Sequence, residues 1–526
     1  MSWDGDSAAM LDALRATPGW HAVAGRPDDA LMAAILDEAA RLAAGVIAPL
    51  DGPGDRSGAR HEGGRVTLPP GARDGFRALA EGGWLALELP EALGGAGLPL
   101  AVFAAVNPAF ERASPALMMA AGSTRAAARL LAEHADPATR DDWVPALAAG
   151  LRTATICISE PGAGSDLARI RTRARHDGTG WRVTGDKIWI SFGDHDLTDR
   201  IGHCVLARST DDPGTRGLSL FLVERGPGVA CTGIERKLGL HASPTCALHF
   251  DAAPARLIGT EGRGLAQLFT MIRQMRLTVG TQGLGVALRC LDMARAHAAE
   301  RCQGGPPDAP PLPIARHPDI RRHLARIAMR VDLLRLALLE AAVSADLGRD
   351  NRCAWLLPMI KTFGAELAFD AADMAVTVLG GAGYTRDHPA EQALRDARVF
   401  AIYEGTTAMQ AQDFLIRQSL ACEGRLLDDF LDRARGDCAD CPLRLAVIED
   451  FAALMTAPRA ETRLPRLRAQ ADPLMRAAWI AVQAWLSARI PGSAAADLFL
   501  ATARPALALQ AAEARGAHRF IDMKGH

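Results

Sequence analysis

The chain has 526 residues, 49% of them hydrophobic, so it is long enough for about three domains, each with its own core. Its 59 basic and 61 acidic residues give a net charge of −2, so the chain as a whole is not attracted to nucleic acid, and no nucleic-acid partner is expected. No run of 18 uninterrupted apolar residues occurs, and the acidic N-terminus is unlike a secretory signal. A cytoplasmic protein without a membrane span is therefore expected.

The positions of the lysines and cysteines argue against several kinds of binding site. Lysine occurs at four positions and never follows glycine, which excludes a phosphate-binding loop of the GK[ST] type. The ten cysteines are dispersed along the chain, which is typical of reduced thiols rather than of a disulfide framework. Cys438 and Cys441 form a CxxC, but no second pair stands nearby to complete a zinc site. We therefore expect a structural role for this pair and predict no metal site.

The first half of the chain divides into a helical part and a strand-rich part. Residues 1–150 contain alanine-, leucine- and arginine-rich segments at helical spacing, separated by glycine and proline. A glycine-rich loop at 89–100 is either a plain connector or the rim of a ligand site. Residues 151–265 carry strand-like runs with short turns and no long helical pattern, so a compact antiparallel β domain is predicted.

Helical periodicity returns in the second half. Residues 266–421 contain long amphipathic segments broken by a proline-rich stretch at 304–314, with a fourth helix beginning near Glu404, and they predict a four-helix bundle. Residues 422–526 repeat the amphipathic pattern and are interpreted as an appended helical domain. The predicted fold class is α+β, with helical, β, bundle and appended helical domains in that order.

The strongest local pattern is the segment CISEPGAGSDL, which begins at Cys157. Its glycine-rich turn exposes backbone N–H groups and hydroxyls, which suits a phosphate or the polar edge of a cofactor, although a plain β-turn is the alternative. The segment contains no GxSxG, so a hydrolase nucleophile is not supported. No GxGxxG opens a helix after a strand, so a dinucleotide fingerprint of the Rossmann type is excluded as well.

A second pattern, DKIWISFGDHDLT, covers residues 186–198. Strand alternation places Trp189 and Ser191 on one face, where an indole and a hydroxyl are able to cover a flat heterocycle; burial of Trp189 in the core is the alternative. Asp194, His195 and Asp196 resemble metal ligands in composition. Alternation points the histidine away from both acids, however, and HExxH spacing is absent, so a loop network is expected instead.

The third pattern is VFAIYEGTTAMQ, residues 399–410. It places one carboxylate, Glu404, directly after an apolar run, Val399 to Ile402. Desolvation by that run raises a carboxylate pKa toward the range of a base that takes a proton from carbon. The alternative is an acid at a helix start, with Thr406 and Thr407 as capping groups. Spacing alone leaves both interpretations open.

Together these patterns resemble a known family. CISEPGAGSDL, KIWIS, KLGLHASPTCALHFD, LGGAGY and IYEGT follow one another, between about residues 75 and 420, as in the flavin-dependent acyl-CoA dehydrogenase family. Shorter motifs such as GDHDLT and HPDIRR, together with the added C-terminal segment, are most similar to the branch of methylmercaptopropionyl-CoA dehydrogenases and long FadE-type proteins. The resemblance implies FAD as cofactor and an acyl-CoA substrate.

The resemblance also implies roles for individual residues. Glu404 takes the place of the catalytic base, and four residues take the places of substrate contacts: Ser165, Arg276, Tyr403 and Gly405. The remaining matched positions imply FAD contacts, with Arg301, Gly380 and Gly381 reaching the FAD of a neighbouring subunit: Ile158, Ser159, Gly164, Ser165, Trp189, Ile190, Ser191, Arg301, Gly380, Gly381 and Thr406. Thr377 departs from the family, which often has glutamine there.

By the same resemblance the reaction is α,β-dehydrogenation of an acyl-CoA to a trans-2-enoyl-CoA, with an electron-transfer flavoprotein as acceptor and a homodimer or dimer of dimers as the assembly. One alternative is an acyl-CoA oxidase that passes electrons to oxygen. Another is a flavin-containing relative that binds DNA through a basic strip of Arg459, Arg463, Arg466 and Arg468. Because many acids accompany that strip, a solvated helix face is the competing interpretation.

Overall fold

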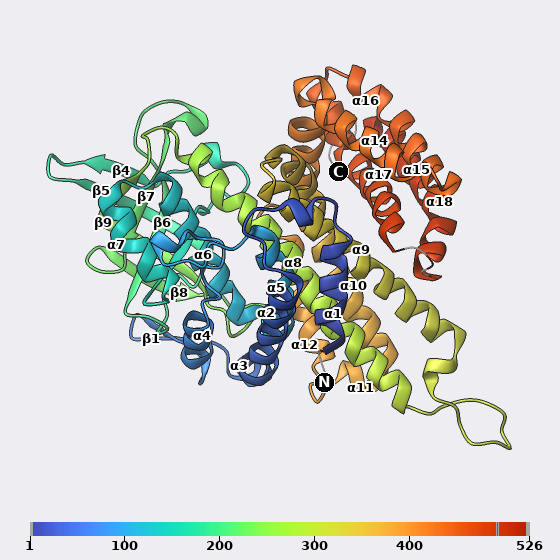
Figure 1. Ribbon diagram of the computed structural model, residues 1–526. Helices are drawn as coiled ribbons and strands as arrows, with labels where there is room; N and C mark the ends of the chain where they lie inside the picture. Colours follow the sequence, from blue (N-terminus) through green and yellow to red (C-terminus); the bar gives the residue numbers. More distant parts are fainter. Residues whose placement is uncertain (1–3, 491, 493, 522–526) are drawn as a thin grey trace. The chain divides into compact units, whose positions relative to one another are not determined.

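The computed structural model describes residues 4–490, 492 and 494–521 (Figure 1). The chain forms two compact units. The first comprises Gly25–Thr278, and the second comprises Gly5–Ala24 together with the described residues from Val279 onward. This division differs from the four predicted domains, whose boundaries stay a prediction.

The first unit begins with helices whose starts follow ordinary capping chemistry. The side chains of Asp28, Ser114 and Asp136 each accept a hydrogen bond from a backbone N–H of the first turn that follows. The helices α5 and α6 are buried along almost their whole length, so they form the centre of this helical part. The six helices are α2 (Asp29–Leu42), α3 (Ala48–Ser57), α4 (Ala72–Glu81), α5 (Leu100–Ala113), α6 (Pro115–His134) and α7 (Pro137–Ala148).

A small hairpin interrupts these helices, although helices alone were predicted for this part of the chain. Its strands are β1 (Arg60–Glu62) and β2 (Arg65–Thr67), and they pair antiparallel. Gly63 and Gly64 connect them with φ values of 58° and 75°. Two successive positive φ angles are what a two-residue hairpin turn needs, and glycine adopts them without steric cost.

The seven-stranded sheet of this unit is mixed rather than wholly antiparallel. Strand β3 pairs parallel with β6, and β4 meets β6 in parallel at one position, whereas every other described pair is antiparallel. The pairings β6–β4–β5–β9–β7–β6 return to their starting strand, so these five strands close on themselves. The strands are β3 (Arg152–Cys157), β4 (Arg173–His176), β5 (Trp181–Ser191), β6 (Arg200–Arg208), β7 (Leu218–Glu224), β8 (Val229–Ile234) and β9 (Thr245–Ile258).

Two hydrophobic clusters stabilise the first unit. One fills the closed sheet and includes Val205, Phe221 and Phe250, all with no exposed surface. The other joins helices to the sheet, and Trp143 and Leu220 are among its members. Burial of such side chains contributes about 1.5–3 kcal/mol each, so the sheet is a firm base for the loops at its ends.

The second unit contains three long helices and several short ones. The fourth helix expected from Glu404 onward is short: α13 begins at Thr407 and passes into a π-helix at Asp413–Ser419. The connection between α8 and α9 extends beyond them as an exposed loop (Figure 1). The helices are α1 (Asp4–Arg15), α8 (Gly264–Glu300), which begins in the first unit, α9 (Pro318–Asp346), α10 (Asp350–Leu379), α11 (Gly381–Tyr384), α12 (Ala390–Ala397) and α13 (Thr407–Gln412).

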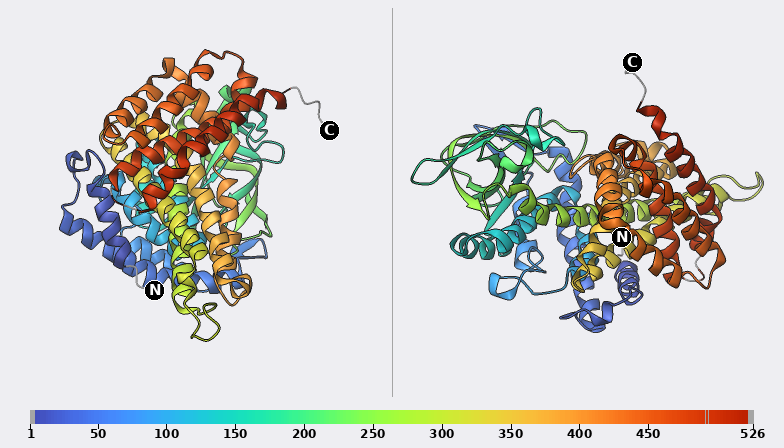
Figure 2. Two further views of the ribbon diagram at one scale, coloured as in Figure 1. Left: turned by 90° about the vertical axis from the view of Figure 1, so that its right-hand side faces the viewer. Right: turned by 90° about the horizontal axis from the view of Figure 1, so that it is seen from above.

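The last hundred residues add helices to this same unit. Figure 2 shows them, in orange to red, lying side by side. They pack on α10 through aromatic pairs: Trp355 stacks on Phe430 with ring centroids 4.6 Å apart, and Phe363 stacks on Trp479 at 5.0 Å. The helices are α14 (Arg425–Asp437), α15 (Pro442–Leu454), α16 (Thr456–Ala460), α17 (Leu464–Leu486) and α18 (Ala494–Gly516).

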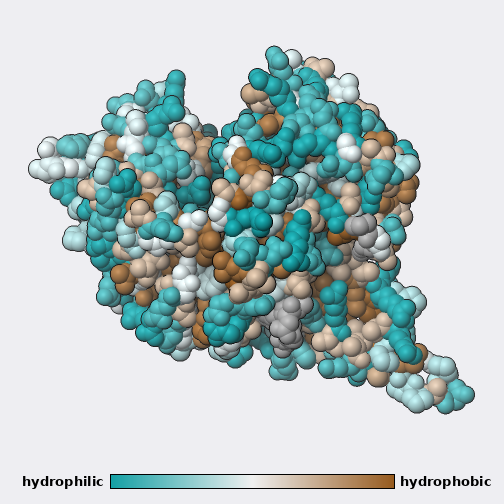
Figure 3. All heavy atoms as spheres, viewed as in Figure 1, coloured by the Kyte–Doolittle hydropathy of each residue, from teal (hydrophilic) through white to brown (hydrophobic). Residues whose placement is uncertain are grey.

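The hydropathy of the helices and of the surface bears on membrane association. Among the described residues no helix combines the length and the apolar character needed to cross a bilayer. On the face shown in Figure 3, hydrophobic residues are interspersed with hydrophilic ones.

Candidate functional site

The glycine-rich segment after β3 forms a tight turn with an open outer side. Glu160 and Ala163 exchange backbone hydrogen bonds of 3.1 and 3.0 Å, which closes the turn. A Cβ built on Gly162 or Gly164 meets nothing within 4 Å, and Ser165 is exposed. The outer face of the turn therefore has room for a ligand beside its backbone and hydroxyl groups.

A buried ion pair fixes this turn to the sheet. Lys187 on β5 has no exposed surface, and its Nζ donates to the Glu160 carboxylate at 2.7 Å and to the Ile158 carbonyl at 2.8 Å. The backbone N–H groups of Arg171 and Thr172 also donate to Glu160, at 2.7 and 3.1 Å. Together these contacts hold Ile158 and its neighbours in one position.

The pKa values of the pair follow from burial and charge. Burial by itself raises the pKa of the Glu160 carboxyl, but the charge of Lys187 and the donated hydrogen bonds outweigh it and lower that pKa below its usual value. Burial lowers the pKa of Lys187, and Glu160 opposes that shift. Each partner thus favours the charged form of the other.

Trp189 lies on an irregular part of strand β5. The pairing of β5 with β9 shifts register between Lys187 and Ile190, and Trp189 adopts φ 63°. Because this bulge breaks strand alternation, regular alternation does not determine which face Trp189 and Ser191 occupy. The indole is 59% exposed, so burial in the core is wrong, whereas Ile190 is 2% exposed. An exposed indole beside the half-buried Ser191 offers a flat surface for an aromatic ligand.

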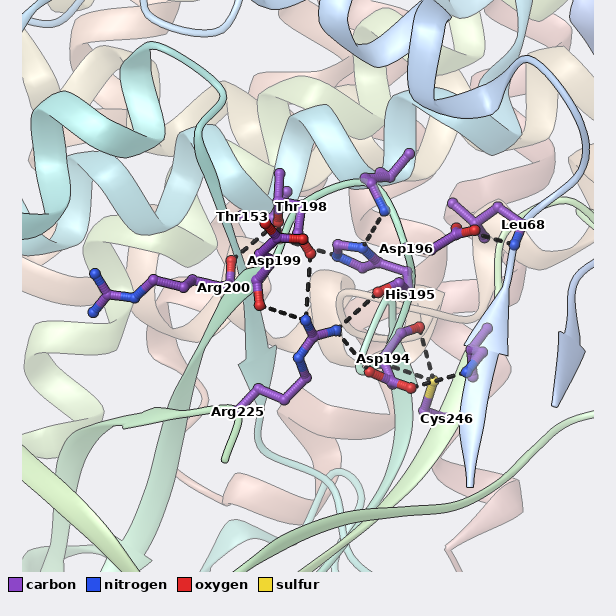
Figure 4. A network of polar contacts seen from close by, with 12 residues as sticks. Leu68, Thr153, Asp194, His195, Asp196, Thr198, Asp199, Arg200, Arg225 and Cys246 are labelled. Carbon is purple, nitrogen blue, oxygen red and sulfur yellow. Dashed lines mark hydrogen bonds and ion pairs between the residues drawn. The ribbon is translucent and has the colours of Figure 1, made fainter. Parts of the chain in front are cut away.

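The acid and histidine residues after β5 form a structural network, as expected (Figure 4). Asp194 accepts hydrogen bonds from Arg225 at 3.1 Å and from the Val66 N–H at 2.9 Å. His195 Nε2 lies 3.0 Å from the Thr153 hydroxyl, and Asp196 accepts from the Leu68 N–H.

Burial lowers the pKa of His195 to about 3, so its ring is neutral at physiological pH. No group of three or more acidic, cysteine or histidine side chains suited to a metal ion occurs among the residues that the structure describes.

Glu404 lies in the second unit, in the loop between a 3-10 helix at Arg398–Ala401 and α13. Its backbone is left-handed, with φ 54°, and Gly405 follows with φ 92°. Two buried side chains hold the loop: Lys361 Nζ donates to the Gly405 carbonyl at 2.8 Å, and Gln410 Nε2 donates to the Glu404 carbonyl at 2.9 Å. A left-handed non-glycine residue costs about 1–3 kcal/mol and persists only where its surroundings impose it.

Two further features constrain this loop. The Tyr403 hydroxyl donates to the side-chain carbonyl of Gln282 on α8. The φ of Gly405 favours glycine, and a Cβ there would also lie 2.8 Å from the Gln410 amide and displace it from its hydrogen bond. The backbone at Glu404 is therefore held by contacts from α8, α10 and α13.

The apolar run before Glu404 is only partly buried. Phe400 has no exposed surface, but Ile402 is 53% exposed and Glu404 itself is half-buried. The prediction that the whole run from Val399 to Ile402 shields the carboxylate from water is therefore wrong for Ile402 in the single chain. Hydrophobic periodicity did not reveal this because the segment ends in a 3-10 turn, where neither helical nor strand alternation applies.

The remaining predicted residues lie at or near the surface of their own unit. In the first unit, Arg276 on α8 is half-buried, as are Ile158 and Ser159. In the second unit the other candidates are exposed: Arg301, Gly380, Gly381 and Thr406. Thr406 is the N-cap residue of α13, yet its side chain caps no backbone N–H.

Sequence reasoning missed the residues that position these loops. Lys187, Lys361 and Gln410 are all buried, and each donates to the backbone of a candidate segment. A signal existed for the lysines: the chain has only four, and Lys361 stands in an apolar segment. A buried lysine needs a strong hydrogen-bond acceptor, so such a lysine is expected to have a structural role.

The sequence matches the acyl-CoA dehydrogenase N-terminal domain over residues 32–151, the middle domain over 155–253 and the C-terminal domain over 262–418. It is 37% identical over 432 residues to the 3-methylmercaptopropionyl-CoA dehydrogenase of Ruegeria pomeroyi, a match that covers 77% of this chain and 73% of that protein. The chain belongs to the acyl-CoA dehydrogenase family.

Two further comparisons agree. The broad-specificity linear acyl-CoA dehydrogenase FadE5 of Mycobacterium tuberculosis is 34% identical over 452 residues, covering 77% of this chain and 73% of that protein. The solved structure of a glutaryl-coenzyme A dehydrogenase with glutaryl-CoA superposes with a TM-score of 0.67 at 26% identity, covering 75% of this chain and 96% of that one.

The resemblance to an acyl-CoA dehydrogenase of the methylmercaptopropionyl and FadE-type branch is thus confirmed, with the α+β fold and the class of enzyme, an acyl-CoA dehydrogenase of a flavoprotein family. The roles of single residues stay predictions.

Proposed function

We propose that this acyl-CoA dehydrogenase binds FAD and removes the α proton of its acyl-CoA with Glu404, yielding a trans-2-enoyl-CoA. The main support is the geometry of the Glu404 loop. Left-handed backbone at a non-glycine residue, fixed by donors from Lys361 and Gln410 on adjacent carbonyls, is what a site needs to aim one carboxylate. The family's α,β-dehydrogenation supplies the reaction.

The residues of the first unit fit a flavin. A flat ring needs an aromatic surface, and Trp189 presents an indole that is 59% exposed on a bulged strand. A phosphate or ribityl chain needs backbone donors, and Gly162 and Gly164 leave open space beside the turn that the Glu160–Lys187 pair fixes. Ile158, Ser159, Ser165, Ile190 and Ser191 complete the proposed flavin and pantetheine contacts.

The chemistry assigned to the chain is a proton transfer. A carbon next to a thioester is weakly acidic, so the base must be close and poorly solvated, and donors must stabilise the enolate oxygen. Glu404 takes the α proton, and its own backbone N–H is the proposed donor to the thioester oxygen. FAD, when bound, supplies the acceptor for the hydride that leaves the β carbon. Ser165, Arg276, Tyr403 and Gly405 are the proposed substrate contacts.

The test is an anaerobic titration of the purified protein with a panel of acyl-CoAs, 3-methylmercaptopropionyl-CoA among them, followed by flavin absorbance. Glu404→Gln should retain FAD and fold but lose most bleaching, because an amide cannot accept the proton. A matched control is Glu423→Gln, an exposed glutamate that also has positive φ, at 60°, and it should bleach normally. Normal bleaching by Glu404→Gln would refute the assignment.

We also propose an electron-transfer flavoprotein as the acceptor and a homodimer or dimer of dimers as the assembly. Arg301, Gly380, Gly381 and Thr406 are exposed in the single chain, which leaves them accessible to FAD, the first three to that of a neighbouring subunit. Arg301→Ala should lower FAD occupancy, measured by the ratio of flavin to protein absorbance. Oxygen uptake as fast as flavin reduction would instead identify an oxidase.

A further inference from the structure

The first unit contains two neighbouring thiols that the assigned roles do not use. Cys231 lies on β8 and Cys246 on β9, and these strands pair antiparallel. Cys231 stands opposite Leu248, and residues two apart on a strand point to the same face of the sheet. Both thiols therefore face the hydrophobic cluster inside the closed sheet, where Cys246 has no exposed surface and Cys231 is partly buried.

The two thiols are in contact with each other and with the backbone around them. They share a hydrogen bond, and Cys231 Sγ also donates to the Gly233 carbonyl at 3.5 Å. On its other side, Cys246 Sγ accepts a hydrogen bond from the Asp194 N–H at 3.3 Å. The register of β8 shifts between Cys231 and Gly233, so the backbone beside Cys231 is not part of a regular ladder.

The two thiols differ in reactivity. Their shared hydrogen bond lowers the pKa of Cys231 against the opposing effect of burial, and it raises the pKa of Cys246, to which burial adds. Cys231 is half-buried, whereas Cys246 is buried. Oxidants react first with the more accessible thiol of lower pKa, and a second thiol in contact with it completes a disulfide. Cys231 has the features of the first thiol and Cys246 those of the second.

Cys246 also connects this pair to the candidate flavin site. Its backbone pairs with Ile190 on β5, next to the exposed Trp189. A Cβ built on Gly193 would lie 2.8 Å from Cys246 Cβ, so the loop after β5 packs directly on this cysteine. Figure 4 shows Cys246 beside Asp194, which belongs to the same loop. A movement of the Cys246 sulfur therefore acts on the segment that follows Trp189.

We propose that Cys231 is an oxidation site and that it forms a reversible disulfide with Cys246 when a hydroperoxide is present. The Cys231 thiolate attacks the peroxide, whose O–O bond breaks, and the products from hydrogen peroxide are a sulfenic acid and water. The Cys246 sulfur then attacks the Cys231 sulfur, the S–O bond breaks, and the released hydroxide leaves with the Cys246 proton as a second water. The two thiols are oxidised by two electrons, and the peroxide is reduced by two.

The disulfide has a consequence for the loop after β5. It turns the Cys246 sulfur toward Cys231, so the Asp194 N–H loses its acceptor and the loop is held less firmly. The dissociation constant of FAD should then rise about three- to ten-fold, which corresponds to the loss of one hydrogen bond. This effect on FAD rests on the proposed function, in which Trp189 contacts the flavin, whereas formation of the disulfide does not.

The test treats the purified holoenzyme with hydrogen peroxide, blocks the remaining thiols with an alkylating reagent and maps the peptides by mass spectrometry. We expect a linked pair of peptides that contain Cys231 and Cys246, lighter by two hydrogen atoms than the separate peptides. Release of FAD, followed by flavin fluorescence, should increase in parallel, and dithiothreitol should reverse both changes. Oxidation of Cys231 without the link would overturn the inference, and so would a link that leaves FAD affinity unchanged.

Variants assign the response to this pair. Cys231→Ser should bind FAD and bleach like the wild type before treatment, and it should show neither the link nor the release of FAD afterwards. The matched control combines Cys302→Ser with Cys422→Ser, which removes two exposed thiols and should respond as the wild type does. A response that persists in Cys231→Ser would overturn the inference. Failure of any acyl-CoA to bleach the untreated protein would instead refute the proposed function, since peptide mapping does not depend on catalysis.

Discussion

Glu404 has an unfavourable backbone conformation that its neighbours stabilise. Its φ of 54° is unfavourable for a side chain with a Cβ, so the conformation needs compensation from neighbours. Lys361 supplies a charged donor to the Gly405 carbonyl from a position with no exposed surface, and Gln410 adds a second donor on the adjacent carbonyl. Because charge-assisted hydrogen bonds are the stronger kind, Lys361 is the main constraint on this loop.

Replacing Lys361 tests that constraint. Lys361→Met should cost about 1–3 kcal/mol of stability, because the Gly405 carbonyl loses its donor. It should also lower the rate of flavin bleaching about ten- to a hundred-fold at unchanged FAD content, because a small misplacement of a base is costly. Stopped-flow bleaching normalised to bound FAD is the measurement. Gln410→Met should act in the same direction with a smaller effect, and wild-type rates in both variants would contradict the positioning role.

The buried Glu160–Lys187 ion pair allows a second prediction, about the stability of the fold. Lys187→Met should destabilise the fold by about 3–5 kcal/mol, because it leaves a carboxylate buried without its partner. Denaturant unfolding measures this loss. The double variant, with Glu160→Gln added, should recover part of it, since no charge is then stranded. Equal losses in the single and double variants would show that the charge is not the cause.

Candidate residues could be predicted from the sequence where they belong to a recognisable motif. They could not be predicted where their position depends on how distant segments pack. Glu404 and the turn of Gly162 and Gly164 stand in strings that single out their positions. Trp189 was assigned correctly to a strand, but the bulge that exposes its indole depends on how β9 pairs with β5, which no local pattern encodes. The hydrogen bond from Arg125 to Thr278 joins two buried residues that lie far apart in the sequence, so only the fold brings them together.

At the scale of elements, β6 contains an unusual internal residue. His203 has no exposed surface, neither ring nitrogen has a hydrogen-bond partner, and its ring packs edge-on against Phe250. Burial lowers the pKa of His203 to about 4, with Asp194 raising it and Arg225 lowering it further. Since the unfolded chain has a pKa near the ordinary value, the unfolded state binds the proton more tightly.

This difference predicts acid sensitivity. The neutral ring contributes stability above about pH 6.5, and that contribution, about 3 kcal/mol, is lost as the pH falls toward 4. His203→Leu removes the group at similar volume, so its unfolding free energy should depend less on pH over this range. Denaturant unfolding at several pH values makes the comparison. Identical pH profiles for variant and wild type would contradict it.

The elements themselves were predicted unevenly. Long helices followed from periodicity, and α8 and α9 lie on either side of the proline-rich stretch at 304–314, as expected. The parallel pairing of β3 with β6 was not predicted, because strand order is not encoded in local sequence. The weakest prediction was the helix at Glu404, where a loop with left-handed backbone precedes the short helix α13.

At the scale of the molecule, the C-terminal helices share a compact unit with the helices around Glu404. Glu340 on α9 accepts hydrogen bonds from Arg433 on α14 at 2.9 Å and from Arg489 at 2.8 Å, and it is 5% exposed. Among the arginines of the predicted basic strip, Arg459 pairs with Asp428, and Arg463 and Arg466 pair with Glu461. Three of the four arginines of the predicted basic strip are thus engaged by acids.

Removal of residues 422–526 tests whether these helices are separable. Because Trp355 and Phe363 on α10 lose their stacked partners Phe430 and Trp479, each large aromatic exposed should cost about 2–3 kcal/mol, and the ion pairs of Glu340 are lost as well. The shortened chain should therefore aggregate or bind a hydrophobic dye, as measured by size-exclusion chromatography and dye fluorescence.

Glu340→Gln in the full chain is the milder control, which retains the aromatic stacking and should stay soluble. A soluble 1–421 chain that bleaches with acyl-CoA at the wild-type rate would mean that the C-terminal helices are an independent addition, not part of the core that holds Lys361 against the Glu404 loop.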